Sequence, residues 1–309
     1  MTDFLIYLVT MVGIWGILSV SLNLQYGVTG LVNLGHVVFF MLGAYISTIL
    51  VMLAGWPIGL GMLGGIAAAA LFGALIAVPT AHLQQDYWAI STLAAAEIVR
   101  LVFLNTRLGG PYVGEAFGVS GIPRPLRDLF ATRSGYDLFY MALVLACLAL
   151  AFALAAWVTR MPFGRTLKAL REGDEVPLAL GKDVGSFRVR AMALGGGLGG
   201  LAGALFAHYN AYIAPDYFLP LETFIVWAMV ILGGPGSFVG VLVGTAVIQT
   251  IHSSTRFVAD WLAMDATVVG SLRMIFIAAL ILLVILYMPN GLVPERRRRY
   301  GSRPPVAPR

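Results

Sequence analysis

The chain has 309 residues, of which 59% are hydrophobic and 11% charged, and its formal net charge is +5. Soluble domains carry about 45–50% apolar and about 25% charged residues, so this composition excludes an ordinary soluble enzyme or binding domain. The basic residues gather in one connecting segment and in the tail, which is typical of membrane topology, and we expect no nucleic-acid partner.

Eight apolar stretches follow one another along the chain, each long enough for a crossing, which needs roughly 20 residues. The sequence therefore predicts an all-α, polytopic integral membrane protein with about 8 to 10 crossings when broken or short helices are included. We expect one transmembrane domain over residues 1–309. The stretches are 4–24, 30–53, 57–79, 87–104, 138–159, 191–212, 223–251 and 267–288.

The first stretch begins after Asp3, has no Lys or Arg before it and lacks a small-residue cleavage site, so we expect a retained helix rather than a secretion signal. The join to the second stretch is weak as a helix because Gly27, Gly30 and Gly35 lie there. Unwound backbone at membrane depth must face protein or a water-filled cavity. Four polar residues there could line a translocation pathway or satisfy unwound backbone, and these are Asn23, Gln25, Asn33 and His36.

The fourth stretch contains Glu97 and Arg100, three residues apart on one face of the expected helix. Charged residues inside a membrane are costly, and pairing offsets this cost. The spacing favours a structural ion pair, although Glu97 is also a candidate for the translocation pathway. The connection 105–137 follows, and we expect it to be external despite its four arginines.

Two later segments set the predicted orientation. Seven basic residues lie in 160–190 and six in the tail 289–309, so the positive-inside rule places both in the cytoplasm. No Lys or Arg precedes Arg100, which leaves the amino-terminal side open, with five or six crossings in the first half. Within 160–190, Leu167, Leu170 and Arg171 have helical spacing, which indicates a short amphipathic helix that could dock another protein.

Two stripes of glycine at intervals of four residues predict close helix packing. His208 and Asn210 end the sixth stretch, where we expect a solvated, interfacial role. The stretch 223–251 is interrupted by Gly233-Gly-Pro-Gly236 and therefore predicts two short helices joined by a bend. Paired interruptions in two halves of a chain are typical of transporters. The packing glycines are Gly195, Gly199 and Gly203, with Gly236, Gly240 and Gly244.

Enzyme signatures are absent from the sequence. Gly181-Lys182 is the nearest approach to a phosphate-binding loop, but Val176 and Asp183 stand where that motif needs Gly and Ser or Thr. The sequence has no His-Glu-x-x-His motif and a single cysteine, Cys147. We therefore expect no catalysis, no metal site and no cofactor in this chain.

Several motifs stand out along the chain, and these are Asn23-Leu-Gln-Tyr-Gly-Val-Thr-Gly-Leu-Val-Asn-Leu-Gly-His36, Phe39-Phe-Met-Leu-Gly-Ala-Tyr45, Gly109-Gly-Pro with Gly121-Ile-Pro-Arg-Pro125, Gly164-Arg-Thr-Leu-Lys-Ala-Leu-Arg-Glu172 with Ala179-Leu-Gly181, and Trp227 to Gly240. Together they resemble the second membrane permease subunit (LivM type) of branched-chain amino acid ABC importers. The motifs follow one another in the family's order over nearly the whole chain. Arg107 and Tyr112 depart from the family in the external loop.

The resemblance implies a multi-pass subunit of a bacterial-type cytoplasmic (inner) membrane importer. Its partners would be a homologous second permease, two ATP-binding subunits and an external solute-binding protein. ATP hydrolysis would then reside in the partners. The residues carried over as the surface that couples to the ATPase are Gly164, Arg165, Leu167, Arg171, Glu172 and Gly181.

The function that these expectations support is import of branched-chain or related hydrophobic amino acids. Related permeases serve importers of urea, amides and aromatic acids, so these substrates are alternatives. An ion-gradient-driven secondary transporter, with Glu97 as proton carrier, is a further alternative and would need no ATPase. A non-transporting membrane scaffold does not explain two interrupted segments.

Overall fold

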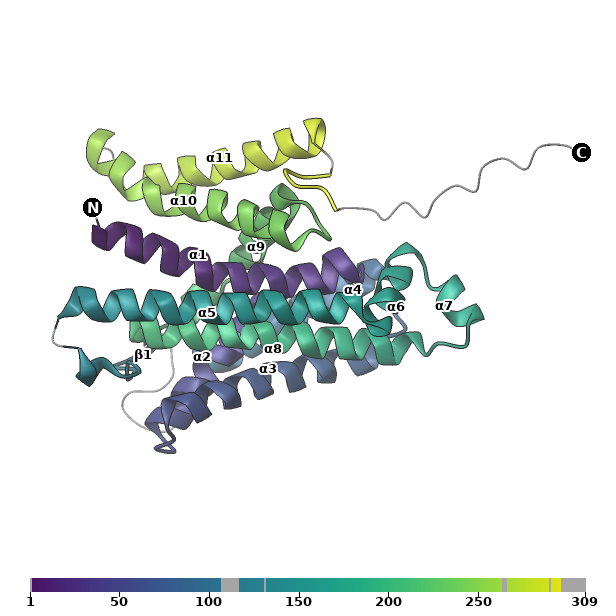
Figure 1. Ribbon diagram of the computed structural model, residues 1–309, viewed down its shortest axis with the longest axis horizontal. Coiled ribbons are helices and arrows are strands. Elements are labelled where there is room, and N and C mark those ends of the chain that lie inside the picture. Colours follow the sequence, from purple (N-terminus) through teal and green to yellow (C-terminus); the bar gives the residue numbers. More distant parts are fainter. Residues whose placement is uncertain (1, 107–116, 131, 263–265, 289, 296–309) are drawn as a thin grey trace, which may run out of the picture.

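The computed structural model describes residues 2–106, 117–130, 132–262, 266–288 and 290–295, and helices dominate it (Figure 1). The prediction of an all-α membrane protein is confirmed. The helices are α1 (Thr2–Leu22), η1 (Asn23–Val28), α2 (Val37–Met52), α3 (Ile58–Thr80), α4 (Gln85–Asn105), η2 (Arg127–Leu129), α5 (Arg133–Arg160), α6 (Pro162–Glu172), α7 (Glu175–Ala179), α8 (Val184–Asn210), η3 (Pro215–Phe218), α9 (Pro220–Gly233), α10 (Phe238–Leu262) and α11 (Ala266–Tyr287), and the strands are β1 (Val119–Ser120) and β2 (Tyr212–Ile213).

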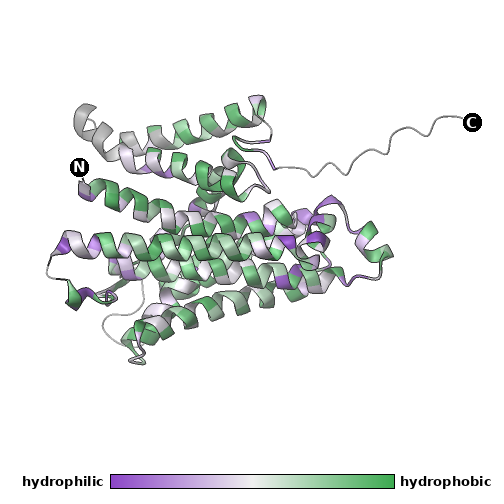
Figure 2. Cartoon of the chain, viewed as in Figure 1, coloured by the Kyte–Doolittle hydropathy of each residue, from purple (hydrophilic) through white to green (hydrophobic). Residues whose placement is uncertain are grey.

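Nine apolar helical segments account for the crossings among the described residues. Five are long enough to span a bilayer, and four are shorter apolar helices, α2, α9 and parts of α10 and α11. Apolar residues cover the middle of the bundle, and hydrophilic residues gather around α6 at one end (Figure 2). The five long spans are Thr2–Val28, Ile58–Thr80, Gln85–Asn105, Arg133–Arg160 and Val184–Asn210.

Small residues of α8 let it pack closely against α2 and α3. Gly203 faces the Phe40 carbonyl oxygen of α2, Gly199 lies against the Phe39 side chain, and Gly195 lies against the Gln25 side chain. The prediction that this stripe is a packing seam is confirmed, because side chains at these positions would keep the helix backbones apart.

We expect Gly203→Ala to lower the stability of the protein by about 1–3 kcal/mol, because the added methyl group overlaps the Phe40 carbonyl oxygen. Gly197→Ala is the matched control on the same helix, since the nearest atom to its new Cβ would be the Ala70 Cβ at 3.5 Å. Thermal unfolding of each purified variant in detergent measures the change in stability that each substitution causes. Equal unfolding temperatures would contradict the packing argument.

The first interruption begins where α1 widens into the π-helical turn η1 and continues as irregular backbone through residues 29–36. The second helix therefore begins at Val37 and not at residue 30, as the apolar stretch predicts. Gly30 adopts a φ of 81°, which residues with a side chain rarely adopt, and this ends the helical path. Segment 29–36 mixes apolar, polar and glycine residues, and it is buried or half-buried in the protein instead of forming a helix.

The second interruption separates α9 from α10, as predicted. Gly234 and Gly236 have φ values of 111° and 87°, which glycine permits, and Pro235 removes a backbone donor. Gly240 and Gly244 pack closely against Gly233 and Met229, so two of the three predicted packing positions are confirmed. The prediction is wrong for Gly236, which lies in the turn before α10 because the helix starts only at Phe238.

The two ends of the bundle differ. The amino terminus, the start of α5 and β1, which pairs antiparallel with β2, lie at one end, where Ser134 Oγ donates to Asp3 Oδ1 at 3.4 Å (Figure 1). Helices α6 and α7 lie at the other end. Five helices, α1 to α5, connect the amino terminus to α6. The amino terminus therefore lies on the side opposite α6, which answers the question that the sequence left open.

Candidate functional site

The predicted amphipathic helix is α6, and it packs against the end of the bundle opposite the amino terminus (Figure 1). Met161 precedes it in an extended conformation and Pro162 occupies its first turn, which favours a helix start. Gly164, Leu167 and Leu170 are buried, whereas Arg165 and Glu172 are exposed on the outward side and Arg171 reaches back toward the bundle. Gly164 cannot carry a side chain, because a Cβ would overlap the backbone of Thr159.

Next to α6, α7 presents apolar side chains to the exterior. Val176, Leu178 and Leu180 are 64%, 58% and 71% exposed at the end where basic residues gather. Gly181 follows with a φ of 68° and forms the turn that leads to α8. A patch of exposed apolar residues beside charged ones is typical of a protein-docking surface. In the sequence this patch corresponds to the run Val176-Pro-Leu-Ala-Leu180. The run is visible in the sequence, but the exposure of its side chains could not be predicted.

Arg171 connects α6 to the first interruption. Its Nη1 donates to the Gly27 carbonyl oxygen at 2.6 Å and to Glu295 Oε2 at 3.0 Å. Lys168 Nζ donates to Glu295 Oε1 at 2.6 Å. The backbone of Gly27 in turn lies against the amide nitrogen of Gly236. Helix α6 and both interrupted segments therefore meet around one arginine.

The segment 290–295 caps the end of α9. The Leu292 and Val293 amides donate to the Leu232 and Gly233 carbonyl oxygens at 2.9 and 3.0 Å. The last carbonyls of a helix lack partners within it, so these bonds satisfy two that would otherwise be unpaired. The predicted basic residues of the tail lie in 296–309, outside the described residues, as do Arg107, Gly109, Gly110 and Tyr112 of the external loop.

The four polar residues of the first interruption are all fully buried, and three of them, Gln25, Asn33 and His36, form one hydrogen-bonded network. Asn33 Nδ2 donates to Gln25 Oε1 at 2.9 Å, and the His36 ring nitrogen Nδ1 lies 3.1 Å from the same oxygen. Asn23 Oδ1 accepts from the Gly236 amide at 2.8 Å. Asn23, and Asn33 through its bond from the Gly35 amide at 3.0 Å, thus satisfy irregular backbone, and a role in lining the pathway stays a prediction.

Helix α9 completes the same region from the other half of the chain. Trp227 Nε1 donates to the Asn33 carbonyl oxygen at 3.0 Å, and the Val37 amide donates to Thr223 Oγ1 at 3.1 Å. The two groups that bind α9 are therefore a backbone carbonyl and a backbone amide in or next to the interruption. A continuous helix would have given both of them backbone partners. Asn23 contacts the second interruption and the Asn33 backbone contacts α9, which are contacts that sequence spacing does not reveal.

Glu97 lies apart from that network, on α4. Arg100 Nε and Nη2 donate to Glu97 Oε2 and Oε1 at 2.9 and 2.6 Å, so the predicted ion pair is confirmed. Arg100 Nη1 also lies 4.0 Å from Asp216 Oδ1 of η3. Asp216 lies 116 residues after Arg100 along the chain, and no motif in the sequence marks it.

His208 is the clearest correction to a predicted role. The expectation of a solvated position is wrong, because its side chain is fully buried. Its Nε2 lies 2.9 Å from Ser47 Oγ and its Nδ1 lies 2.7 Å from the Pro123 carbonyl oxygen. Gly118 to Pro123 fold over the end of α8 through the β1–β2 pair, which removes His208 from solvent.

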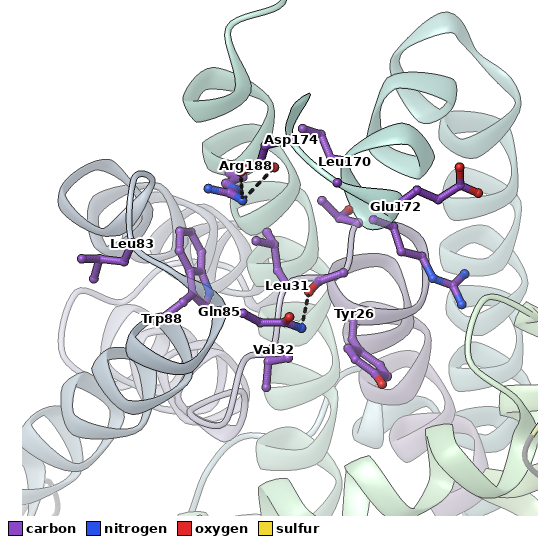
Figure 3. A pocket seen from close by; sticks show the side chains of 14 residues that line it. Tyr26, Leu31, Val32, Leu83, Gln85, Trp88, Leu170, Glu172, Asp174 and Arg188 are labelled. Carbon is purple, nitrogen blue, oxygen red and sulfur yellow. Dashed lines mark hydrogen bonds and ion pairs between the residues drawn. The ribbon is translucent and has the colours of Figure 1, made fainter. Parts of the chain in front are cut away.

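A cavity of about 510 Å³ opens between α6, segment 29–32 and the start of α4 (Figure 3). Gln85 Nε2 donates to the Gly30 carbonyl oxygen at 3.2 Å, and Arg188 binds Asp174 on the opposite rim at 2.8 and 3.0 Å. Trp88 and Tyr26 form part of its wall, with Leu170 from α6. Within the part of the chain that the structure describes, no cluster of His, Cys, Asp and Glu could hold a metal ion.

Known proteins are similar to this chain along most of its length. Residues 4–285 match the family described as "Branched-chain amino acid transport system / permease component". The high-affinity branched-chain amino acid transport system permease protein LivM of Salmonella typhimurium is 31% identical, with 93% of this chain and 69% of LivM aligned. The probable LivM of Methanocaldococcus jannaschii is 29% identical over 92% and 91%, and LivH of Escherichia coli is 22% identical over 92% of each. No solved structure matches significantly.

Proposed function

Because the chain belongs to the branched-chain amino acid transport permease family, we propose that it forms, with a homologous second permease, the membrane pathway of an ABC importer for branched-chain amino acids. The chain is a transport subunit rather than an enzyme. Two ATP-binding subunits would drive the cycle, and an external solute-binding protein would deliver the substrate. The assembly would lie in a cytoplasmic membrane of bacterial type.

The observation that carries this proposal is the link from α6 to both interruptions. The outward residues of α6 and the exposed apolar residues of α7 form a surface suited to an ATP-binding subunit. A shift of α6 would pull on Gly27 through Arg171, and Gly27 contacts the turn at Gly236. Packed elements move as rigid bodies, so closure of the ATPase would displace α9 and η1 together.

Substrate identity rests on the relatives, whose names specify branched-chain amino acid transport for LivM and LivH. We propose the same class for this chain. In uptake assays, leucine, isoleucine and valine should compete with one another. Competition by urea, amides or aromatic acids instead would assign one of the other substrates to the same machinery.

A pull-down of the tagged protein from mild detergent tests the assembly. We expect mass spectrometry to identify a second permease and ATP-binding subunits with it, and the complex in liposomes to import leucine only when ATP is supplied on the ATPase side. A chain recovered alone, yet active without ATP, would overturn the proposal and indicate a gradient-driven carrier. In that case Glu97→Gln should remove the pH dependence of uptake.

A further inference from the structure

The cavity beside α6 lies next to the path that links α6 to the two interruptions, but the proposed function gives it no role. It opens between α6, the irregular segment 29–32 and the first turn of α4 (Figure 3). Its volume of about 510 Å³ lies within the range of about 300–1,000 Å³ that is typical of small-molecule sites. The cavity is therefore large enough to hold an amino acid.

Backbone groups in the wall of this cavity lack partners within the described protein. Val32 lines the cavity and is half-buried. Its amide and its carbonyl oxygen have no hydrogen-bond partner among the described residues, although the neighbouring Leu31 amide donates to the Gln25 carbonyl oxygen at 3.0 Å. Backbone groups away from bulk water are nearly always paired in folded proteins. One donor and one acceptor are therefore available to a molecule in the cavity.

A side chain of α4 adds another unpaired donor. Trp88 lines the cavity and is 1% exposed, and its buried Nε1 has no hydrogen-bond partner among the described residues. An unpaired buried donor is destabilising, and few are retained in folded proteins. A ligand that supplies an acceptor would explain why a tryptophan, and not a purely apolar residue, lies in this wall.

The rim carries a positive and a negative charge side by side. Arg188 Nη2 donates to Asp174 Oδ1 and Oδ2 at 3.0 and 2.8 Å, and both residues line the cavity (Figure 3). The Asp174 side chain is 39% exposed and can accept further hydrogen bonds. Leu31, Leu83 and Leu170 supply apolar surface in the same cavity. Charges of both signs beside apolar surface match a zwitterion that carries an apolar side chain.

We propose that this cavity binds a zwitterionic amino acid with an apolar side chain, and that the bound molecule inhibits transport. Asp174 and the Val32 carbonyl oxygen are the acceptors for its ammonium group, and Arg188 and the Val32 amide are the donors to its carboxylate. This inference rests on the proposed function, which makes such an amino acid the product released on the side where α6 meets the ATPase.

Inhibition follows from the elements that the ligand contacts. Leu170 belongs to α6, whereas Val32 belongs to the first interruption. The shift of α6 in the proposed cycle therefore changes the shape of the cavity. A ligand that contacts both walls favours the arrangement in which it fits and opposes that shift. Product that accumulates on this side thereby slows further uptake.

Uptake by the complex in liposomes that enclose ATP tests the proposal. The initial rate of labelled leucine uptake is measured while unlabelled leucine inside the liposomes is raised, and each rate is compared with that of the same variant without internal leucine. We expect inhibition, and Asp174→Asn should raise the inhibitory concentration roughly tenfold or more, because a charged hydrogen-bond acceptor is lost. Glu175→Gln is the matched control, since Glu175 is adjacent but does not line the cavity.

Trp88→Phe separates ligand binding from packing. Phenylalanine keeps an aromatic ring in the wall and removes the unpaired donor. The unfolding temperature of the ligand-free complex in detergent should therefore stay the same or rise, whereas the increase caused by added leucine should become smaller. Glycine is the control ligand, because it is a zwitterion without an apolar side chain and should stabilise the complex less than leucine.

Four results would overturn the inference. They are uptake that internal leucine leaves unchanged, inhibition that is equally strong with internal glycine, inhibition that Asp174→Asn does not weaken relative to Glu175→Gln, and stabilisation by leucine that Trp88→Phe does not reduce. The proposed function fails separately, if the unsubstituted complex imports no amino acid when ATP is enclosed. If it imports leucine and internal leucine has no effect, only this inference fails.

Discussion

Replacing Arg171 with alanine should abolish ATP-driven uptake while leaving the complex assembled. The substitution removes the charged hydrogen bond to the Gly27 carbonyl oxygen, which is the described side-chain bond from α6 to the first interruption. Hydrogen bonds to charged groups contribute about 1.5–3 kcal/mol, which corresponds to roughly a tenfold or larger change in an equilibrium. We expect ATP hydrolysis to continue without stimulation by substrate, measured beside leucine uptake in liposomes.

Lys168→Ala is the matched control for this prediction. Lys168 lies on the same helix and binds the same Glu295, but it makes no bond to Gly27. Pairs of this exposed kind contribute about 0–1 kcal/mol, so uptake should stay close to that of the unsubstituted protein. If Arg171→Ala retains substrate-stimulated hydrolysis and uptake, the coupling role of Arg171 is wrong. If both variants fail equally, the essential contact is with Glu295.

Replacing Asn23 with leucine should destabilise the protein and stop transport together. Asn23 Oδ1 accepts the hydrogen bond of the Gly236 amide and thereby joins the two interruptions. Without it, a buried donor loses its partner, which costs about 1–3 kcal/mol. We expect a lower unfolding temperature in detergent and loss of uptake, because the hydrogen bond that fixes η1 against the turn before α10 is lost.

Thr245→Val provides the comparison for Asn23. Thr245 is equally buried, but its hydroxyl donates only to the Val241 carbonyl of its own helix, at 2.8 Å among the described contacts. That carbonyl has a backbone partner within α10, so valine should be tolerated. Similar unfolding temperatures for the two variants would show that the bond between Asn23 and Gly236 does not hold the interruptions together.

The sequence predicts local features of this fold well. Gly-Gly-Pro-Gly predicts the break between α9 and α10, and the glycines near Gly30 predict the first interruption, because both depend on backbone conformations that only a few residue types allow. The amphipathic helix α6 is predictable from its own spacing. The start of α2 at Val37 was not predicted, because Leu31, Val32 and Leu34 extend the apolar stretch toward the amino terminus and the glycines do not mark the residue at which a helix resumes.

Contacts between distant segments were beyond sequence analysis. Nothing in the amino-acid sequence indicates that Arg171 binds the carbonyl oxygen of Gly27, which lies 144 residues earlier. The sequence correctly places His208 near the end of its helix, which predicts an interfacial position. It does not predict the β1–β2 pair, which covers that end of the helix and buries His208. The residues predicted to couple to the ATPase share one region, because five of them lie on α6 and Gly181 forms the turn before α8, and their coupling role stays a prediction.

The cap on α9 has a consequence for the order in which the protein matures. Residues 290–295 leave the ribosome after the described helices α1 to α11 have been synthesised, yet they complete the end of α9 and supply Glu295 to α6. A nascent chain therefore carries an unfinished surface at this end of the bundle until its last described helix has been made. If ATP-binding subunits dock there, as proposed, a chain shortened before residue 290 would lack the finished surface that they need.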